Sequence, residues 1–167
     1  MKKPLHIMIM SIVCLLFSGF TTFAQKVDDK DLILGNWKHS NGRSVVSIYK
    51  GKQENGEDPG KYYGKIVWLL EPNNDDGTPR TDVNNDEDEL KSQPLKGLVI
   101  MKDMEFEEVD GKMVYWDGGT IYDPNNGSTY SFEAEIDKKN KNVMDGRGFI
   151  GVSLFGRTDT WTRLVRK

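Results

Sequence analysis

The sequence predicts an all-β fold, and we expect a small antiparallel up-and-down barrel of eight strands. Apolar and aromatic runs of five to ten residues alternate with Gly, Asn and Asp turn signals, while sustained helical periodicity is nearly absent. Eight strands in about 140 residues must hide their edges. Closure into a barrel does so most completely, with a pair of packed sheets as the alternative.

Each apolar run predicts one strand. In chain order the expected strands are 34–39, 44–50, 61–70, 97–104, 112–122, 129–136, 142–150 and 158–165. Asn41-Gly42, Asp110-Gly111 and Asn126-Gly127 lie between such runs, and glycine tolerates the positive φ of tight hairpins. We therefore expect neighbouring strands to pair antiparallel.

The sixth strand has the clearest alternation. Tyr130, Phe132, Ala134 and Ile136 point to one face, and the intervening polar residues point to the other. Several other strands contain glycines: Gly64, the pair Gly118-Gly119, and Gly146 and Gly148 around Arg147. We interpret them as bulges or bends at barrel corners, the alternative being close approach of a ligand to the backbone.

A long acidic insertion, 71–96, separates the third and fourth strands. Its part 71–89 holds eight acids against Arg80, and loops of this length are commonly functional or mobile. Asp86 is predicted to cap a short helix, with Glu89 three residues later and Pro94 beyond its end.

The same insertion contains a weak calcium-like pattern. Oxygen ligands recur at alternate positions, at Asp82, Asn84, Asp86 and Asp88. An EF-hand loop would need Gly and Glu where this chain has Glu87 and Gln93, so that motif fails. A different calcium site or a solvated acidic turn are the remaining interpretations, and no other cofactor is expected.

Residues 1–24 read as a cleaved signal peptide. Lys2 and Lys3 precede an apolar stretch, and Thr22-Phe23-Ala24 supplies the small residues of a cleavage site. We therefore expect an exported protein, periplasmic or extracellular, with a single β-barrel domain at 25–167 and no transmembrane anchor in the mature chain.

The composition excludes several kinds of chemistry. Without residues 1–24 the chain has 21 basic and 26 acidic residues, a charge of −5, which disfavours a nucleic-acid partner. Cys14 and His6 leave with that segment, so disulfides, thiolate sites and multi-histidine metal sites are excluded. A serine triad would need His39, but no nucleophile elbow accompanies it, and we interpret it as a polar strand-end residue.

Candidate binding residues come from the aromatic side chains and the arginines. Most aromatics in a small barrel fill the core, but any lumen would be lined by some of them. A buried guanidinium needs an anion, so an arginine in a lumen would bind a ligand carboxylate or phosphate, and we place Arg147 before Arg157 because glycines flank it. The alternative for Arg147 is a salt bridge to a neighbouring strand. The candidates are Trp68, Trp116, Tyr122, Arg147 and Arg157.

Paired carboxylates are the remaining catalytic possibility. Asp117, Asp123, Asp145 and Asp159 lie near predicted strand ends, but catalysis would require two of them to meet in a cleft. A turn role explains Asp123-Pro124 more simply. We expect no catalytic residue.

Three stretches carry a resemblance to a known family. They are Asp82-Val83-Asn84-Asn85-Asp86 with the following Pro94-Leu95-Lys96-Gly97-Leu98, then Trp116-Asp117-Gly118-Gly119-Thr120-Ile121-Tyr122-Asp123-Pro124, and finally Gly146-Arg147-Gly148-Phe149 with Gly156-Arg157-Thr158 and Trp161-Thr162-Arg163. In this order the chain resembles the uncharacterised exported bacterial proteins of domain of unknown function 2147. Lys91 and Gln93 replace arginines that are frequent in that family, so no anion-binding role is carried over to them.

The resemblance implies a calycin-like or lipocalin-like barrel in the periplasm of a Gram-negative cell. Trp37 in the first strand and Arg163 in the last resemble the N-terminal Trp and C-terminal Arg that close the barrel in lipocalins. Such stacking contributes roughly 0.5–2 kcal/mol. The family brings no established reaction with it.

We therefore favour a non-enzymatic exported barrel that binds a small apolar or amphipathic molecule. One alternative is an envelope interaction or structural module with a solid barrel, whose acidic loop contacts a partner or calcium. The other is an enzyme that uses carboxylates.

Overall fold

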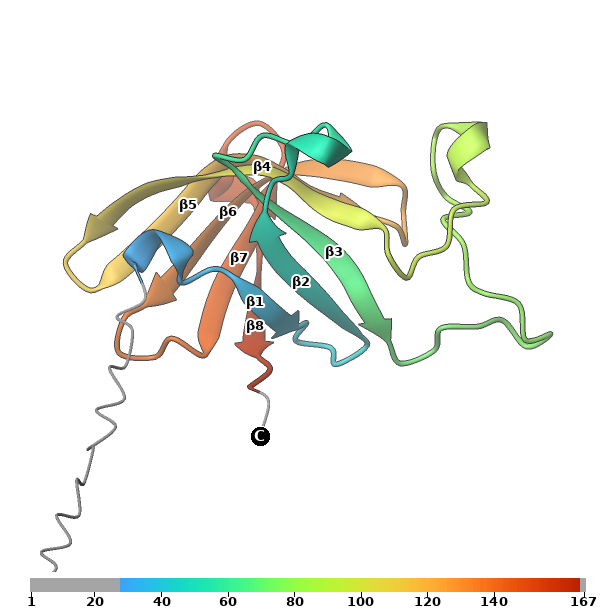
Figure 1. Cartoon of the computed structure of the whole chain (residues 1–167), viewed down its shortest axis with the longest axis horizontal. Coiled ribbons are helices and arrows are strands. Elements are labelled where there is room, and N and C mark those ends of the chain that lie inside the picture. The colour runs from blue at the N-terminus through green and yellow to red at the C-terminus, as the bar shows by residue number, and fades with distance from the viewer. Residues whose placement is uncertain (1–27, 166–167) are drawn as a thin grey trace, which may run out of the picture.

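Eight strands close into an antiparallel barrel in the computed structural model, which describes residues 28–165 (Figure 1). The strands are β1 Gly35–Lys38, β2 Ser44–Lys50, β3 Tyr62–Leu69, β4 Val99–Asp110, β5 Met113–Asp123, β6 Ser128–Asp137, β7 Val143–Phe149 and β8 Arg157–Arg163. In the described part of the chain four 3-10 turns accompany them: η1 Asp29–Asp31, η2 Gln53–Asn55, η3 Asp88–Leu90 and η4 Ser153–Phe155.

Every predicted strand is present, and each pairs antiparallel with its neighbour in sequence. The barrel closes where Trp37 and Lys38 of β1 pair with Arg163 and Thr162 of β8. One strand end was wrong: β4 continues past the predicted end at 104 and pairs with β5 as far as Asp110. Exposed acidic side chains such as Glu105 and Glu107 interrupt the apolar run there, and the pairing with β5 resumes at Val109 after a shift of register.

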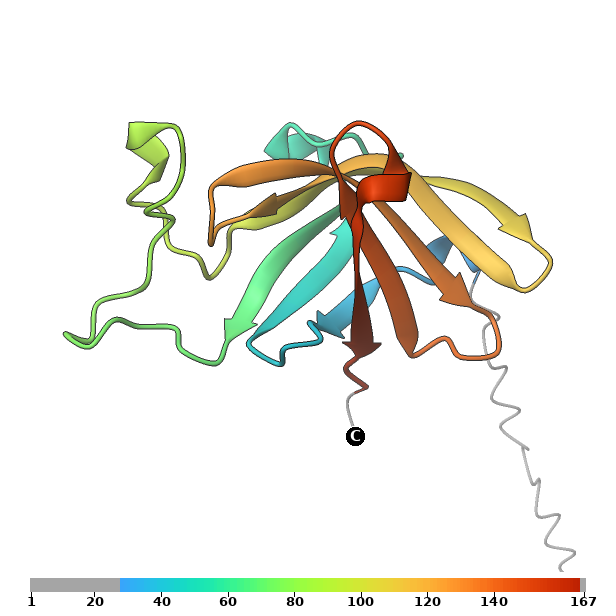
Figure 2. The same ribbon diagram turned by 180° about the vertical axis from the view of Figure 1, so that it is seen from behind.

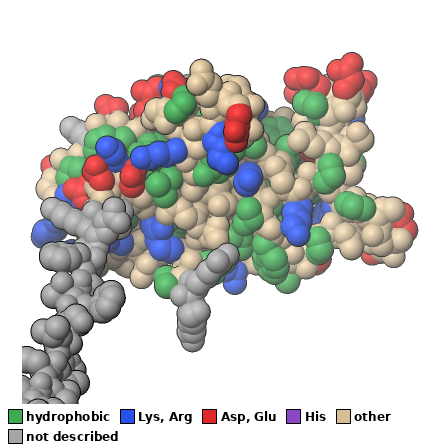
Figure 3. Space-filling model, in the orientation of Figure 1, with side chains coloured by type: hydrophobic (Ala, Val, Ile, Leu, Met, Phe, Trp, Pro, Cys, Tyr) green, Lys and Arg blue, Asp and Glu red, His purple; other side chains and the backbone are tan. Residues whose placement is uncertain are grey.

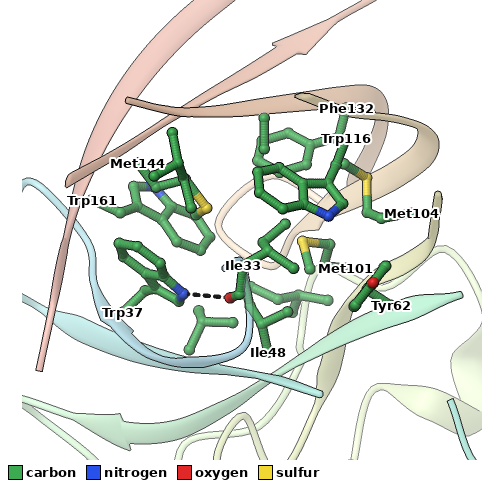
Figure 4. Packing of buried hydrophobic residues seen from close by; sticks show 14 of the residues in the cluster. Ile33, Trp37, Ile48, Tyr62, Met101, Met104, Trp116, Phe132, Met144 and Trp161 are labelled. Atoms are coloured by element: carbon green, nitrogen blue, oxygen red, sulfur yellow. Dashed lines mark hydrogen bonds between the residues drawn. The ribbon is translucent and has the colours of Figure 1, made fainter. Parts of the chain in front are cut away.

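The core fills the end of the barrel where the described chain begins. Ile33, which follows η1, is fully buried among aromatic and methionine side chains, and Trp37 Nε1 donates to its carbonyl oxygen at 2.8 Å (Figure 4). Trp116 Nε1 donates to the Lys30 carbonyl oxygen at 3.2 Å. The segment ahead of β1 thus plugs one end of the barrel.

The alternation predicted for β6 is confirmed, since Phe132, Ala134 and Ile136 are all buried. The bulge interpretation holds at Gly64 and Gly119, where the strand register shifts. Gly146 does not lie at a bulge, because its strand keeps its register. A Cβ there would lie 2.5 Å from Cζ of Phe132, so this glycine makes room for the ring.

The insertion between β3 and β4 projects from the barrel in Figure 1, and acidic side chains gather at its outer end (Figure 3). The predicted helix is only the 3-10 turn η3, preceded by Glu87 without a side-chain cap, so the capping role of Asp86 was wrong. A longer helix has no room here, because Pro94 disfavours a helical conformation in the residue before it and forms an isolated antiparallel bridge with Thr81.

The predicted signal peptide, residues 1–24, lies outside the described residues. Within residues 28–165, no helix combines the length and the apolar composition that a membrane-spanning helix needs.

Candidate ligand-binding calyx

A cavity of about 560 Å³ occupies the barrel end opposite the plug. In an up-and-down barrel the β1–β2, β3–β4, β5–β6 and β7–β8 connections share one end, and residues on or beside all four line this cavity. Its inner wall is apolar, formed by Ile66, Leu69, Leu95, Ile100, Ile121, Phe132 and Trp161. We call this cavity the calyx; its volume suits one small molecule.

The calyx rim is polar, and most of its charged side chains have polar partners. Glu71 Oε2 lies 2.6 Å from Arg43 Nη2 and 3.6 Å from Arg80 Nη1. Asp159 Oδ2 lies 3.1 Å from His39 Nε2. Arg157 also lines the calyx, but its guanidinium has no hydrogen-bond or ion-pair partner within residues 28–165. Arg157 is therefore a rim cation available to a ligand.

His39 lies in the calyx wall, with its ring 5.6 Å from that of Trp161. Ser40 Oγ donates to Asp159 and not to the imidazole. Nucleophilic catalysis requires the serine hydroxyl to face the histidine, so these three side chains are not arranged as a triad.

A buried carboxylate fastens the insertion to the calyx wall. Asp82 is fully buried and accepts hydrogen bonds from Tyr122 Oη at 2.8 Å and Asn85 Nδ2 at 2.7 Å. Burial, together with Asp82, raises the pKa of Tyr122 to about 12. Asn84 Nδ2 donates to the carbonyl oxygens of Pro124 and Asn125, so a second contact holds the insertion against the β5–β6 turn.

We expect Tyr122→Phe to lower the free energy of unfolding by about 1–3 kcal/mol, because Asp82 would stay buried with one partner fewer. Urea denaturation checks this value. Tyr130→Phe, which removes a hydroxyl that accepts only from exposed Asn126, is the matched control. Equal stability of the two variants would contradict an anchoring role for the Tyr122–Asp82 contact.

Of the five predicted ligand-binding residues, Tyr122 and Arg157 line the calyx. Trp116 does not, because it is fully buried in the core beside the plug. Trp68 is 43% exposed. Val45 pairs with Trp68 while Val46 pairs with Ile66, so an extra residue in β3 turns Trp68 outward and Leu69 into the calyx.

Arg147 lies on the outer surface of the barrel, because it alternates with the inward-facing Gly146 and Gly148. There it lines a groove of about 420 Å³ across β4 to β8, whose charged residues are otherwise acidic. Burial, with Asp145 and Glu133 nearby, raises the pKa of Glu135 in this groove. Arg147 is therefore not the lumen arginine that its flanking glycines indicated.

Three of the four predicted calcium ligands have other partners. Asp82 is occupied by Tyr122 and Asn85, Asn84 by backbone carbonyls, and Asp88 by Lys91. Among the residues that the structure describes, no three His, Cys, Asp or Glu side chains could together hold a metal ion. Calcium binding by this insertion stays a prediction.

The four candidate catalytic carboxylates divide between two places. Asp117 and Asp145 line the outer groove, whereas Asp123 and Asp159 line the calyx. Asp123 accepts from the Asn125 backbone and side-chain amides in its own turn. None of the four is buried; of the charged residues in the described part of the chain, only Asp82 is.

Trp37 and Arg163 meet at the plugged end of the barrel. The guanidinium carbon lies 4.1 Å from the centroid of the Trp37 ring. Arg163 also donates to the carbonyl oxygens of Leu32, Leu34 and Lys141. It therefore ties the plug and the β6–β7 connection to β8.

Comparisons with known proteins agree with this architecture. Residues 35–163 match the family described as "Uncharacterized protein conserved in bacteria (DUF2147)". A solved Helicobacter pylori structure, described as belonging to the lipocalin family, is similar with a TM-score of 0.60 and 21% identity, over 79% of this chain and 82% of that one. No curated protein matches the chain.

Proposed function

This chain belongs to the DUF2147 family of uncharacterized bacterial proteins, and we propose that its lipocalin-like barrel binds one small amphipathic molecule in the calyx. The observation that carries the proposal is the cavity of about 560 Å³ with an apolar wall and a polar rim. Such a cavity would bury an apolar body and leave a polar end near the rim.

The charged side chains of the calyx rim indicate the charge of the ligand. The acids Glu71, Asp123 and Asp159 already have partners, whereas Arg157 has none among the described residues. A carboxylate or phosphate at the polar end of the ligand would pair with Arg157. We thus propose an anionic amphiphile bound without chemical conversion.

Export is part of the same proposal. It rests on the signal-peptide pattern of residues 1–24, and it places the binding protein in the periplasm or outside the cell. The alternative of a solid barrel receives less support, because the calyx leaves about 560 Å³ of space at the end opposite the plug.

Titration with dodecanoate and with dodecanol tests both parts of the proposal. We expect dodecanoate to bind saturably at one site per chain. Calorimetry at a pH above the pKa of the dodecanoate carboxylate measures this binding. Native mass spectrometry of freshly purified protein would reveal a bound natural ligand. Absence of saturable binding by either probe, with no co-purified molecule, would reject a small-molecule function.

Arg157→Gln is expected to weaken dodecanoate binding about three- to tenfold and to leave dodecanol binding unchanged, since only the acid carries the charge. Lys102→Gln is the matched control, because Lys102 is exposed on β4 and does not line the calyx. Equal weakening of both probes would mean that Arg157 does not recognise the anion.

A further inference from the structure

The β7–β8 connection exposes four large apolar side chains in six residues. Leu154 and Phe155 are each 81% exposed, Ile150 is 74% exposed and Val152 is 58% exposed. Figure 2 shows this connection, with η4, standing out beyond the strands that it joins. We call residues 150–155 the apolar tip. Apolar side chains exposed together in this way mark interaction sites.

The apolar tip is held in place by polar contacts at its base. Arg147 Nε donates to the Ser153 carbonyl oxygen at 2.7 Å, and Arg147 Nη2 donates to that of Leu154 at 3.1 Å. Ser153 Oγ donates to Glu133 Oε1 at 2.5 Å. The barrel thus fixes the backbone of the tip while its large apolar side chains face solvent, an arrangement that favours docking at low entropic cost.

The apolar tip borders the calyx. It leaves the barrel after Gly148 and Phe149 and returns at Arg157, and both Gly148 and Arg157 line the calyx. The segment from Phe149 to Arg157 contains no acidic residue. An apolar projection next to a cation that has no partner within residues 28–165 complements a phospholipid surface, where acyl chains lie below anionic phosphates.

We propose that the apolar tip inserts into the interface of a phospholipid bilayer and brings the calyx rim to the membrane surface. Arg157 then lies at the level of the headgroup phosphates. This inference rests on the proposed function, because a membrane is the natural source or destination of an amphiphile carried in the calyx. A protruding tip beside a cation fits a lipid surface directly, and docking of the tip on a second copy is the alternative that light scattering separates below.

Co-sedimentation with phosphatidylcholine vesicles tests this proposal. The wild-type chain is expected to bind, and binding should persist at high salt because apolar insertion drives it. Leu154→Asp and Phe155→Asp should each lower the partition coefficient about tenfold or more. The control is Val83→Asp, which adds the same charge at an exposed apolar residue of the insertion and should bind as wild type.

Three results would overturn the proposal. The first is that the wild-type chain does not bind vesicles, and the second is that the Val83→Asp control loses as much binding as the tip variants. The third is a concentration-dependent dimer, detected by light scattering, that both tip variants abolish; a second copy of the chain would then be the occupant of the tip. Dodecanoate titration without vesicles distinguishes a failure of ligand binding in the calyx from a failure of membrane docking by the tip. Normal titration by Phe155→Asp shows an intact calyx, so failure of vesicle binding alone would reject only membrane docking.

Discussion

Replacing Trp37 with alanine is expected to lower the free energy of unfolding by about 3–5 kcal/mol. The side chain is fully buried where the first and last strands meet. Its removal leaves a cavity beneath the plug. It also removes the hydrogen bond that Trp37 Nε1 donates to the Ile33 carbonyl oxygen. The effect combines lost apolar burial, a lost hydrogen bond and a lost stacking surface for Arg163.

Urea denaturation followed by circular dichroism measures this loss. Trp68→Ala is the matched control, since it deletes the same side chain at a position that is 43% exposed, and its cost is expected to be at most about 1 kcal/mol. If the two tryptophan variants lost equal stability, the closure by Trp37 would be contradicted.

Arg163 permits a sharper test of the same closure. Burial lowers the pKa of its guanidinium, and three backbone carbonyls accept from it. Because the planar guanidinium places its donors in a fixed fork, Arg163→Lys cannot reproduce all three contacts. A double-mutant cycle between Trp37 and Arg163 is expected to give a coupling of about 0.5–2 kcal/mol.

The fold was predictable because the strand signals are local. Alternation in β6 and the Asn-Gly and Asp-Gly turns placed all the other strand ends within two residues of their observed positions. The end of β4 was missed since its outward-facing acids resemble a loop in sequence. The position of that end is set by pairing with β5, which is a contact between strands and not a local signal in the sequence of β4.

The calyx was less predictable because a strand face depends on register. One extra residue in β3 reverses which side Trp68 takes, and no local signal marks that bulge. Arg147 could have been placed correctly, since alternation puts it opposite Gly146 and Gly148 on β7. The same alternation on β8 places Arg157 on the face of Trp161 and Arg163, a signal that was present in the sequence.

Filling the calyx is expected to have the largest effect on binding. Gly148→Phe should reduce dodecanoate affinity at least about tenfold, because a benzyl group at this position occupies the space meant for the ligand. The substitution itself is tolerable. A Cβ at Gly148 would meet Ile121 and Tyr130 at 3.7 Å, an ordinary contact distance, and its φ is not in the left-handed region.

Two variants make the result specific to the calyx. Thr129→Phe adds the same aromatic group at an exposed position of β6 and should bind dodecanoate as wild type does. Gly146→Phe should lose stability instead, since even its Cβ would lie 2.5 Å from Cζ of Phe132. A stable Gly148→Phe protein with undiminished affinity would place the ligand outside the calyx, and the outer groove of β4 to β8 would then be the site to test.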